Sequence, residues 1–263
     1  MKNSPQNSNI IAENRSSILE KLNHYQWFLN TDTDIKNELL SLPEDHDGFL
    51  EDMIGRTDEL DNMDILKLER LERGNHLITP VFIVRSHETN QVFTYEYVSW
   101  KSGANPGYKG ILLIENENKI THFITKTIFK FSQNAQVYDS FGGFIEFKNK
   151  HLVNFPKVQE AEIKHQLGTD DLIIKEFIDL GFINPDIGMS NNRSSLFAAV
   201  IDGSQATRLM LDTPLKTKGI SFKISIHPID ELPKLLLNIN DSFFLSAIAR
   251  LVAIGKLNLK LDK

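Results

Sequence analysis

The sequence predicts an α+β fold in which a helical N-terminal segment precedes a domain of strands and helices. Three features predict it: helical spacing of apolar residues early in the chain, short β-branched and alternating segments after Leu77, and separate helical segments further on. We therefore expect two parts, an N-terminal helical extension at 1–75 and an α+β domain at 76–263. Residues 1–9 are expected to be disordered because they are polar and have nothing to bury.

Capping and breaking residues bound the helices expected in the first part. Thr31 or Asp32 caps the second helix, Pro43 ends it, and Gly74 ends the fourth. The four helices cover about Ile10–Leu29, the segment from the cap to Leu42, Gly48–Ile54 and Asp58–Arg73.

The second part begins with a predicted hairpin. Leu77–Ser86 is rich in β-branched residues, Val92–Trp100 alternates polar with apolar residues, and the turn-like His87–Asn90 joins them. Further strands are expected at Gly110–Ile114, Ile120–Phe131, Val137–Phe141, Ser195–Ile201 and Ile220–His227. Helices are expected at Lys157–Leu167, Glu231–Leu237 and Ser242–Leu257.

Composition and motifs narrow the classes of function. The chain has no cysteine, which excludes disulfides, thiolate metal sites and a cysteine nucleophile. No apolar run approaches the ~20 residues that span a bilayer, and no signal-peptide core is present, so we expect a cytoplasmic protein without membrane contact. Residues 1–75 hold 16 acidic and eight basic side chains, which argues against nucleic acid as a partner. Phosphate-loop, serine-elbow and zinc signatures are all missing from the sequence.

A Gly-Gly turn followed by a helix points to a family. The turn is Ser140-Phe141-Gly142-Gly143-Phe144-Ile145-Glu146, and the helix carries Ala161-Glu162-Ile163-Lys164-His165-Gln166-Leu167-Gly168. With the strands before them, these segments resemble the box of Nudix enzymes that cleave ADP-ribose and nucleotide sugars. The spacing within the helix matches that family, whereas the gap between turn and helix is longer. The resemblance covers roughly 77–257 and implies a Nudix-type α/β/α sandwich with a mixed sheet.

The resemblance also implies a charge deficit. Helix positions i, i+3 and i+4 share one face. All three are glutamates in the family, where they hold Mg²⁺ against a pyrophosphate, but here they are Glu162, His165 and Gln166. The arginine that usually precedes the first glutamate is Ala161, and the loop Thr213–Gly219 contains no carboxylate. We expect the affinity for Mg²⁺ to be low.

The candidate residues each have a structural alternative. As catalytic residues the resemblance implies Glu146, Glu162 and His165, although Glu146 is equally suited to bonding the Gly-Gly turn. Glu162 and His165 also have the Glu-x-x-His spacing of a transition-metal pair, or form a solvated helix face. The candidate ligand-binding residues are Lys126, Phe141, Gln166 and Arg193. Their alternatives are the strand surface for Lys126, the core for Phe141, and the protein surface for the other two.

Two classes of function follow. The preferred one is non-hydrolytic binding of a nucleotide, a nucleotide sugar or a protein partner, which requires no cofactor. The alternative is a Mg²⁺-dependent Nudix hydrolase that uses Glu146 and Glu162, with or without His165, on an ADP-ribose-like compound; another reaction on such a substrate also stays open. The hairpin Leu77–Trp100 lies where related enzymes exchange strands, which predicts a homodimer unless the N-terminal helices cover that surface.

Overall fold

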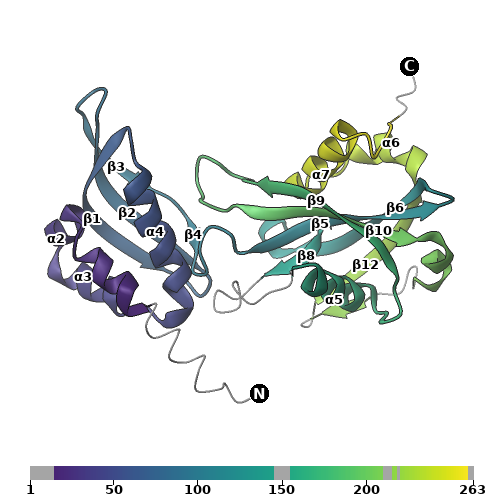
Figure 1. The fold of residues 1–263 in the computed structure, drawn as a ribbon, viewed down its shortest axis with the longest axis horizontal. Coiled ribbons are helices and arrows are strands. Elements are labelled where there is room, and N and C mark those ends of the chain that lie inside the picture. Colours follow the sequence, from purple (N-terminus) through teal and green to yellow (C-terminus); the bar gives the residue numbers. More distant parts are fainter. Residues whose placement is uncertain (1–14, 145–154, 210–214, 218–219, 260–263) are drawn as a thin grey trace, which may run out of the picture. The chain divides into compact units, whose positions relative to one another are not determined.

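The structure is a computed structural model that describes residues 15–144, 155–209, 215–217 and 220–259 (Figure 1). Glu146 and the residues predicted to be disordered, 1–9, lie outside this part of the chain. The chain forms two compact units. The first contains the residues up to Pro106 and the loop Asp186–Arg193, and the second contains Gly107–Phe144, Leu152–Pro185 and Ser194–Lys263. Each unit is described by itself below.

Short helices open the first unit. They are residues 15–22, α2 (Gln26–Asn30), α3 (Thr33–Leu40), η1 (Glu44–His46) and α4 (Asp47–Glu59). The continuous helix predicted over Ile10–Leu29 is therefore wrong, because the chain turns at residues 23–25. Leu22 and Trp27 are both buried although five positions separate them, and one straight helix would not place them on the same face.

The first unit also contains an antiparallel sheet. Its strands are β1 (Met63–Arg73), β2 (Leu77–Ser86), β3 (Val92–Glu96) and β4 (Ser99–Trp100), ordered β1-β2-β3 with β4 also paired to β2. The predicted hairpin is confirmed, but the helix predicted over Asp58–Arg73 is wrong from Met63 onward. Two irregularities in the β1–β2 register interrupt the two-residue alternation, so Leu68 and Leu71 are both buried at a spacing that imitates a helix.

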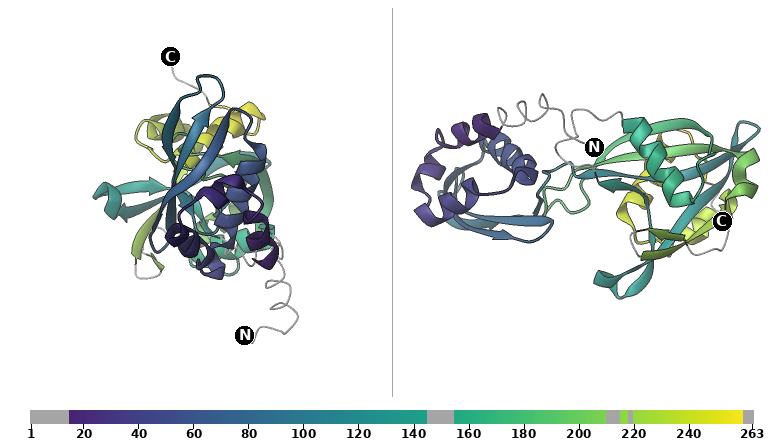
Figure 2. Two further views of the ribbon diagram at one scale, coloured as in Figure 1. Left: turned by 90° about the vertical axis from the view of Figure 1, so that its left-hand side faces the viewer. Right: turned by 90° about the horizontal axis from the view of Figure 1, so that it is seen from below.

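The helices cover one face of this sheet (Figure 2). The buried side chains of Trp27, Phe49 and Phe82 belong to one apolar cluster that joins helices to strands. Thr31, at the end of α2, donates its hydroxyl hydrogen to the Trp27 carbonyl at 2.8 Å and accepts the Leu68 amide at 2.9 Å. The helical segment thus covers one face of the hairpin and leaves the edge strand β3 exposed, so the homodimer stays a prediction.

The second unit is built on a mixed sheet. Its strands are β5 (Gly107–Asn116), β6 (Lys119–Lys130), β7 (Ala135–Asp139), β8 (Phe141–Phe144), β9 (Ile174–Ile183), β10 (Ser194–Asp202), β11 (Leu215–Thr217) and β12 (Ile220–Pro228). The order is β11-β12-β6-β5-β10-β9, with β7 paired to β6 and β8 paired to β5. Strand β10 runs parallel to β5, and the other pairs are antiparallel.

Helices lie on both faces of this sheet (Figure 1). The helices are α5 (Phe155–Leu167), α6 (Leu232–Leu236) and α7 (Ser242–Ala253), with short turns η2 (Phe131–Gln133), η4 (Gly203–Arg208) and η5 (Ile229–Glu231). Leu196, Ala198 and Val200 alternate along β10 and face the apolar side of α7, which packs with α6 on one face of the sheet. Helix α5 covers the other face and buries Ile163 and Leu167.

Most strands and helices predicted for this unit are confirmed. The strand predicted over Val137–Phe141 is divided between β7 and β8, and the segment predicted as a loop at Thr213–Gly219 contains β11. Strand β9 was not predicted. Its signal was present, since Ile174, Ile178 and Leu180 fall on alternate positions of a segment between two turns. None of the helices in the described part of the chain is both long enough and apolar enough to cross a membrane.

Candidate functional site

Three lysines surround one aspartate on the sheet of the second unit. Asp139 of β7 lies opposite Lys126 of β6, and such cross-strand neighbours project from the same face. The Lys126 ammonium is 3.0 Å from the Asp139 carboxylate, and those of Lys109 and Lys130 are 3.5 and 3.4 Å from it. We call these four residues the lysine cluster; it carries two positive charges in excess.

The burial of this cluster makes its charges interact strongly. The Asp139 side chain is 13% exposed and that of Lys126 is 7% exposed. Burial alone would raise the pKa of the Asp139 carboxyl, but the positive charges of the three lysines outweigh it and hold that pKa below its ordinary value. Burial lowers the pKa of the Lys126 ammonium, and Asp139 opposes that effect only in part. The excess positive charge is thus held partly out of water, where it attracts an anion most strongly.

Gln166 connects the lysine cluster to helix α5. Its amide nitrogen donates to the Gly142 carbonyl at 2.8 Å and to the Glu162 carboxylate at 2.6 Å, and its amide oxygen accepts from Lys126 at 3.3 Å. These partners fix the orientation of the amide, because two acceptors lie on one side and an ammonium on the other. Gln166 is buried, so its hydrogen-bonding capacity is directed to these protein groups.

The two glycines of the turn permit this close arrangement. Gly142 has φ +141°, and a Cβ there would lie 2.1 Å from the Tyr108 carbonyl oxygen. A Cβ at Gly143 would lie 3.5 Å from the Glu162 carboxyl carbon, which shows how near β8 comes to α5. A side chain at Gly142 would push β8 away from β5, whereas a Cβ at Gly143 would make ordinary van der Waals contact with Glu162.

Tyr108 is a neighbour that sequence reasoning missed. Its hydroxyl donates to the Val158 carbonyl at 3.4 Å, and burial, followed by the nearby Glu162 charge, raises its pKa to about 12. Lys109 and Asp139 were missed as well. The signal available for Asp139 was its position as a lone acid directly before the Gly-Gly turn.

The remaining candidates lie in different surroundings. His165 is exposed on α5, whereas Glu162 is half-buried and Gln166 is buried, so the helix directs Gln166 toward the sheet. The Phe141 ring is 1% exposed, and the Lys126 ammonium lies 5.3 Å from its centroid. Arg193 is an exposed residue of the first unit, and its backbone amide donates to the Ala104 carbonyl. The structure therefore brings together Lys126, Phe141, Glu162 and Gln166.

The described residues of this site do not fit the Mg²⁺ that the resemblance implies. Mg²⁺ takes hard oxygen ligands in octahedral geometry, several of them anionic in Nudix-type sites. The described part of the chain holds no group of three or more acidic, histidine or cysteine side chains placed to bind a metal ion. In addition, Glu162 accepts an amide hydrogen from Gln166, and the Lys126 ammonium lies at the other end of that amide. We therefore derive no catalytic step through a metal ion.

Comparisons with known proteins agree with the sheet and helix arrangement. No family model and no curated protein matches this chain. A solved structure described as "Crystal structure of ADP compounds hydrolase" is similar with a TM-score of 0.55 at 13% sequence identity, over 76% of this chain and 99% of that one. The fold is Nudix-like. The predicted α/β/α sandwich with a mixed sheet is thereby confirmed.

In this Nudix-like fold, polar and charged side chains join the turn to helix α5. The Gly142–Gly143 turn and helix α5 meet through Gln166 and Glu162. At 13% identity the similarity concerns the fold alone. The chemistry has to be argued from the side chains in this chain.

Proposed function

We propose that the Nudix-like unit binds a nucleotide or nucleotide sugar through its diphosphate and leaves it intact. The observation that carries the proposal is the lysine cluster, with two positive charges in excess beside the Gly142–Gly143 turn. Lysine ammonium groups are ordinary ligands of phosphate. The solved structure of similar fold is that of an ADP compounds hydrolase, which supports an ADP-type ligand.

The lysine cluster supplies positive charge, as a bound metal ion would. Lys109 and Lys130 have side chains that are 24% and 40% exposed, so both can turn toward a ligand while remaining near Asp139. Lys126 is more deeply buried, lies over the Phe141 ring and bonds Gln166, which suits it to hold the cluster in place. A diphosphate would thus be neutralised without a metal ion.

The same network disfavours hydrolysis. A water molecule must be activated by a base or by a metal ion to attack a phosphate. Gln166 is a neutral amide, and it donates a hydrogen bond to Glu162, the carboxylate that lies against Gly143. One oxygen of the Glu162 carboxylate is therefore already engaged by a protein group.

A hydrolase remains the second candidate, and one observation favours it. Glu162 lies beside Gly143 on the helix that follows the turn, as the first glutamate of a Nudix box does. In this proposal Glu162 and His165 would hold Mg²⁺, and Glu146 and Glu162 would act as catalytic residues in the cleavage of an ADP-ribose-like compound. Glu146 lies outside the described residues, and the exposed His165 would have to reorient.

Calorimetry with ADP-ribose distinguishes the two candidate functions, binding without hydrolysis and hydrolysis. We expect binding in EDTA to be within about twofold of binding in Mg²⁺, and Lys109→Met to weaken it about tenfold, as loss of one charge-assisted contact implies. The matched control is Lys175→Met, which removes a lysine of the same unit that pairs with Glu115. Mg²⁺-dependent release of AMP that Glu162→Gln abolishes would support the hydrolase and contradict our proposal.

A homodimer is a separate part of the proposal. Strand β3 lies at an edge of the first unit's sheet, and all five of its residues are exposed, Val92, Phe93 and Tyr95 among them. An exposed edge with apolar side chains favours strand pairing between copies. Sedimentation velocity is the test: a dimer that Phe93→Lys converts to a monomer supports this surface, and a monomeric wild-type protein contradicts it.

A further inference from the structure

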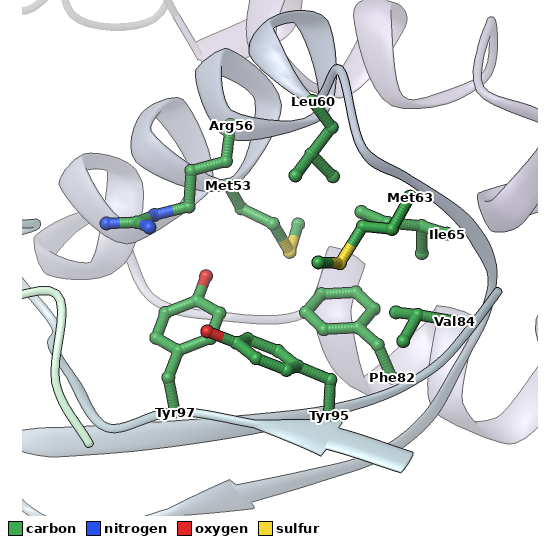
Figure 3. Close-up of a pocket in the computed structure, with 9 residues that line it drawn as sticks. All are labelled: Met53, Arg56, Leu60, Met63, Ile65, Phe82, Val84, Tyr95 and Tyr97. Carbon is green, nitrogen blue, oxygen red and sulfur yellow. The ribbon is translucent and has the colours of Figure 1, made fainter. Parts of the chain in front are cut away.

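The first unit contains a pocket that the proposed function does not use. It has a volume of about 260 Å³ and lies between helix α4 and the strands β1 to β3 (Figure 3). Its walls are mostly apolar and include Met53, Met63, Phe82 and Val84. Arg56, Tyr95 and Tyr97 carry its polar groups, as Figure 3 shows.

The Tyr97 hydroxyl is an unusual feature of this pocket. The residue is 8% exposed, and its buried hydroxyl has no hydrogen-bond partner among the residues that the structure describes. Leaving a buried hydroxyl unpaired is unfavourable, and most native hydroxyls of this kind have a partner. The hydroxyl therefore points to an acceptor supplied by a bound molecule.

Arg56 places a positive charge beside the same hydroxyl. Its guanidinium carbon lies 5.0 Å from the centroid of the Tyr97 ring, and its side chain is exposed. No described carboxylate forms an ion pair with it in the structure. An exposed guanidinium moves readily, so an anionic group can enter between it and the hydroxyl and accept hydrogen bonds from both.

The apolar side favours an aromatic ring of limited size. The Phe82 and Tyr97 rings are stacked, with centroids 6.5 Å apart and an interplanar angle of 17°. The methionines Met53 and Met63 add polarizable sulfur atoms, which make favourable contacts with aromatic rings. The volume of about 260 Å³ is slightly below the range typical of drug-sized ligands, ~300–1,000 Å³, which suits one ring and not a dinucleotide.

We propose that this pocket binds a small aromatic carboxylic acid, its ring against Phe82 and the methionines and its carboxylate on Arg56 and Tyr97. The site belongs entirely to the first unit and does not depend on the function proposed for the second. It also gives that unit, to which the sequence assigned no role, a ligand of its own.

Phenylacetate and its uncharged analogue phenylacetamide are the probes, titrated by calorimetry into the full chain. We expect phenylacetate to bind about tenfold more tightly than the amide, because only the acid forms charge-assisted bonds. Arg56→Met should abolish this preference, and Tyr97→Phe should weaken phenylacetate binding about fivefold. The matched control is Arg70→Met, which removes an exposed arginine of the same unit that pairs with Glu72.

The outcomes that overturn the proposal are distinct. No binding of phenylacetate, equal binding of acid and amide, or equal binding of hexanoate would each contradict it. Unchanged phenylacetate affinity in both Arg56→Met and Tyr97→Phe would place any binding elsewhere. Because Arg56 is exposed and Tyr97→Phe keeps the ring, both variants are expected to fold, and circular dichroism checks this.

Discussion

The two sites of this protein differ in how their buried polar groups are satisfied. In the second unit, Lys126, Asp139 and Gln166 bond one another, and the network extends to Glu162. In the first unit, the Tyr97 hydroxyl is buried at the side of an apolar pocket without a described partner. A network whose polar groups are all hydrogen-bonded holds its charges in place. A buried donor without a partner is stabilised most by a hydrogen bond to a bound ligand's acceptor. The predictions below test this contrast, beginning with the largest expected effect.

Asp139→Asn should have the largest effect on stability. It leaves the buried Lys126 ammonium and its two neighbouring lysines without a carboxylate, and we expect a loss of about 2–4 kcal/mol. Unfolding in urea, followed by circular dichroism, measures it, since both tryptophans, Trp27 and Trp100, belong to the first unit. The exposed Asp230→Asn is the control and should change stability by less than about 0.5 kcal/mol.

The loss of stability caused by Asp139→Asn should become smaller as the pH falls. The pKa of Asp139 is held below its ordinary value by the lysines, so its stabilising contribution is present above the unfolded-state pKa of about 3.9 and is lost as the pH falls through the folded-state pKa. Asp139→Asn should therefore cost most near pH 7 and progressively less below about pH 4. A penalty that is independent of pH would contradict the role of this carboxylate.

Gln166→Glu should disrupt the hydrogen-bond network of the second unit at its centre. It replaces an amide donor by a carboxylate that faces the Glu162 carboxylate and the Gly142 carbonyl, and we expect a loss of about 2 kcal/mol at neutral pH. Two facing carboxylates raise one another's pKa, so the variant should be relatively more stable at pH 4.5 than at pH 8.

The preceding residue on the same helix provides the control. His165→Glu adds a carboxylate at an exposed position and should change stability by less than about 0.5 kcal/mol. If added Mg²⁺ restores the stability of Gln166→Glu, the missing carboxylate is what limits metal affinity. If Gln166→Glu is as stable as the wild type, the hydrogen bonds of the Gln166 side-chain amide do not contribute to stability in solution.

Thr31→Val tests a satisfied hydroxyl within the first unit. The hydroxyl bonds both the Trp27 carbonyl and the Leu68 amide, and the residue is buried. Removing it leaves the Leu68 amide without that partner, and a loss of about 1–2 kcal/mol is expected. Tryptophan fluorescence in urea reports this unit, and the exposed Thr94→Val should unfold with the wild-type midpoint. Equal midpoints for both variants would refute the assignment.

Tyr97→Phe should have the smallest effect and the opposite sign. It removes the hydroxyl that has no described partner while keeping the ring, so the unliganded protein should gain about 1 kcal/mol. The measurement is the same fluorescence titration. A destabilised Tyr97→Phe would mean that the hydroxyl has a partner in solution and would weaken the case for a ligand there.

Local sequence patterns identified most of the secondary structure, and their failures are informative. The apolar alternation of Val92–Trp100 correctly predicted part of a hairpin, because strand alternation is a local property. Strand β1 was mistaken for a helix because Leu60, Met63, Leu66 and Leu68 lie close to helical spacing. The register irregularities that bury both Leu68 and Leu71 in a strand depend on the pairing with β2. Patterns within one segment do not record how its partner strand is aligned.

The same distinction between local patterns and tertiary contacts applies to the candidate site. Glu162 and Gln166 were located from their spacing on one helix, which local geometry fixes. Lys109 and Asp139 were not, because their association with Lys126 depends on the registers of β5, β6 and β7. His165 was grouped with Glu162 by spacing alone, and only the packing of α5 against the sheet separates an exposed residue from a buried one.

The sequence by itself therefore determined the α+β class, the Gly-Gly turn followed by a helix, and a helix face that carries Glu162, His165 and Gln166. Each of these is a property of residue types and short spacings. The tertiary structure decided that three lysines share one aspartate, that Gln166 bridges them to Glu162, and that Tyr97 is buried beside a pocket. Such contacts join residues far apart in the chain, and burial, which gives them their electrostatic strength, exists only once the chain has folded.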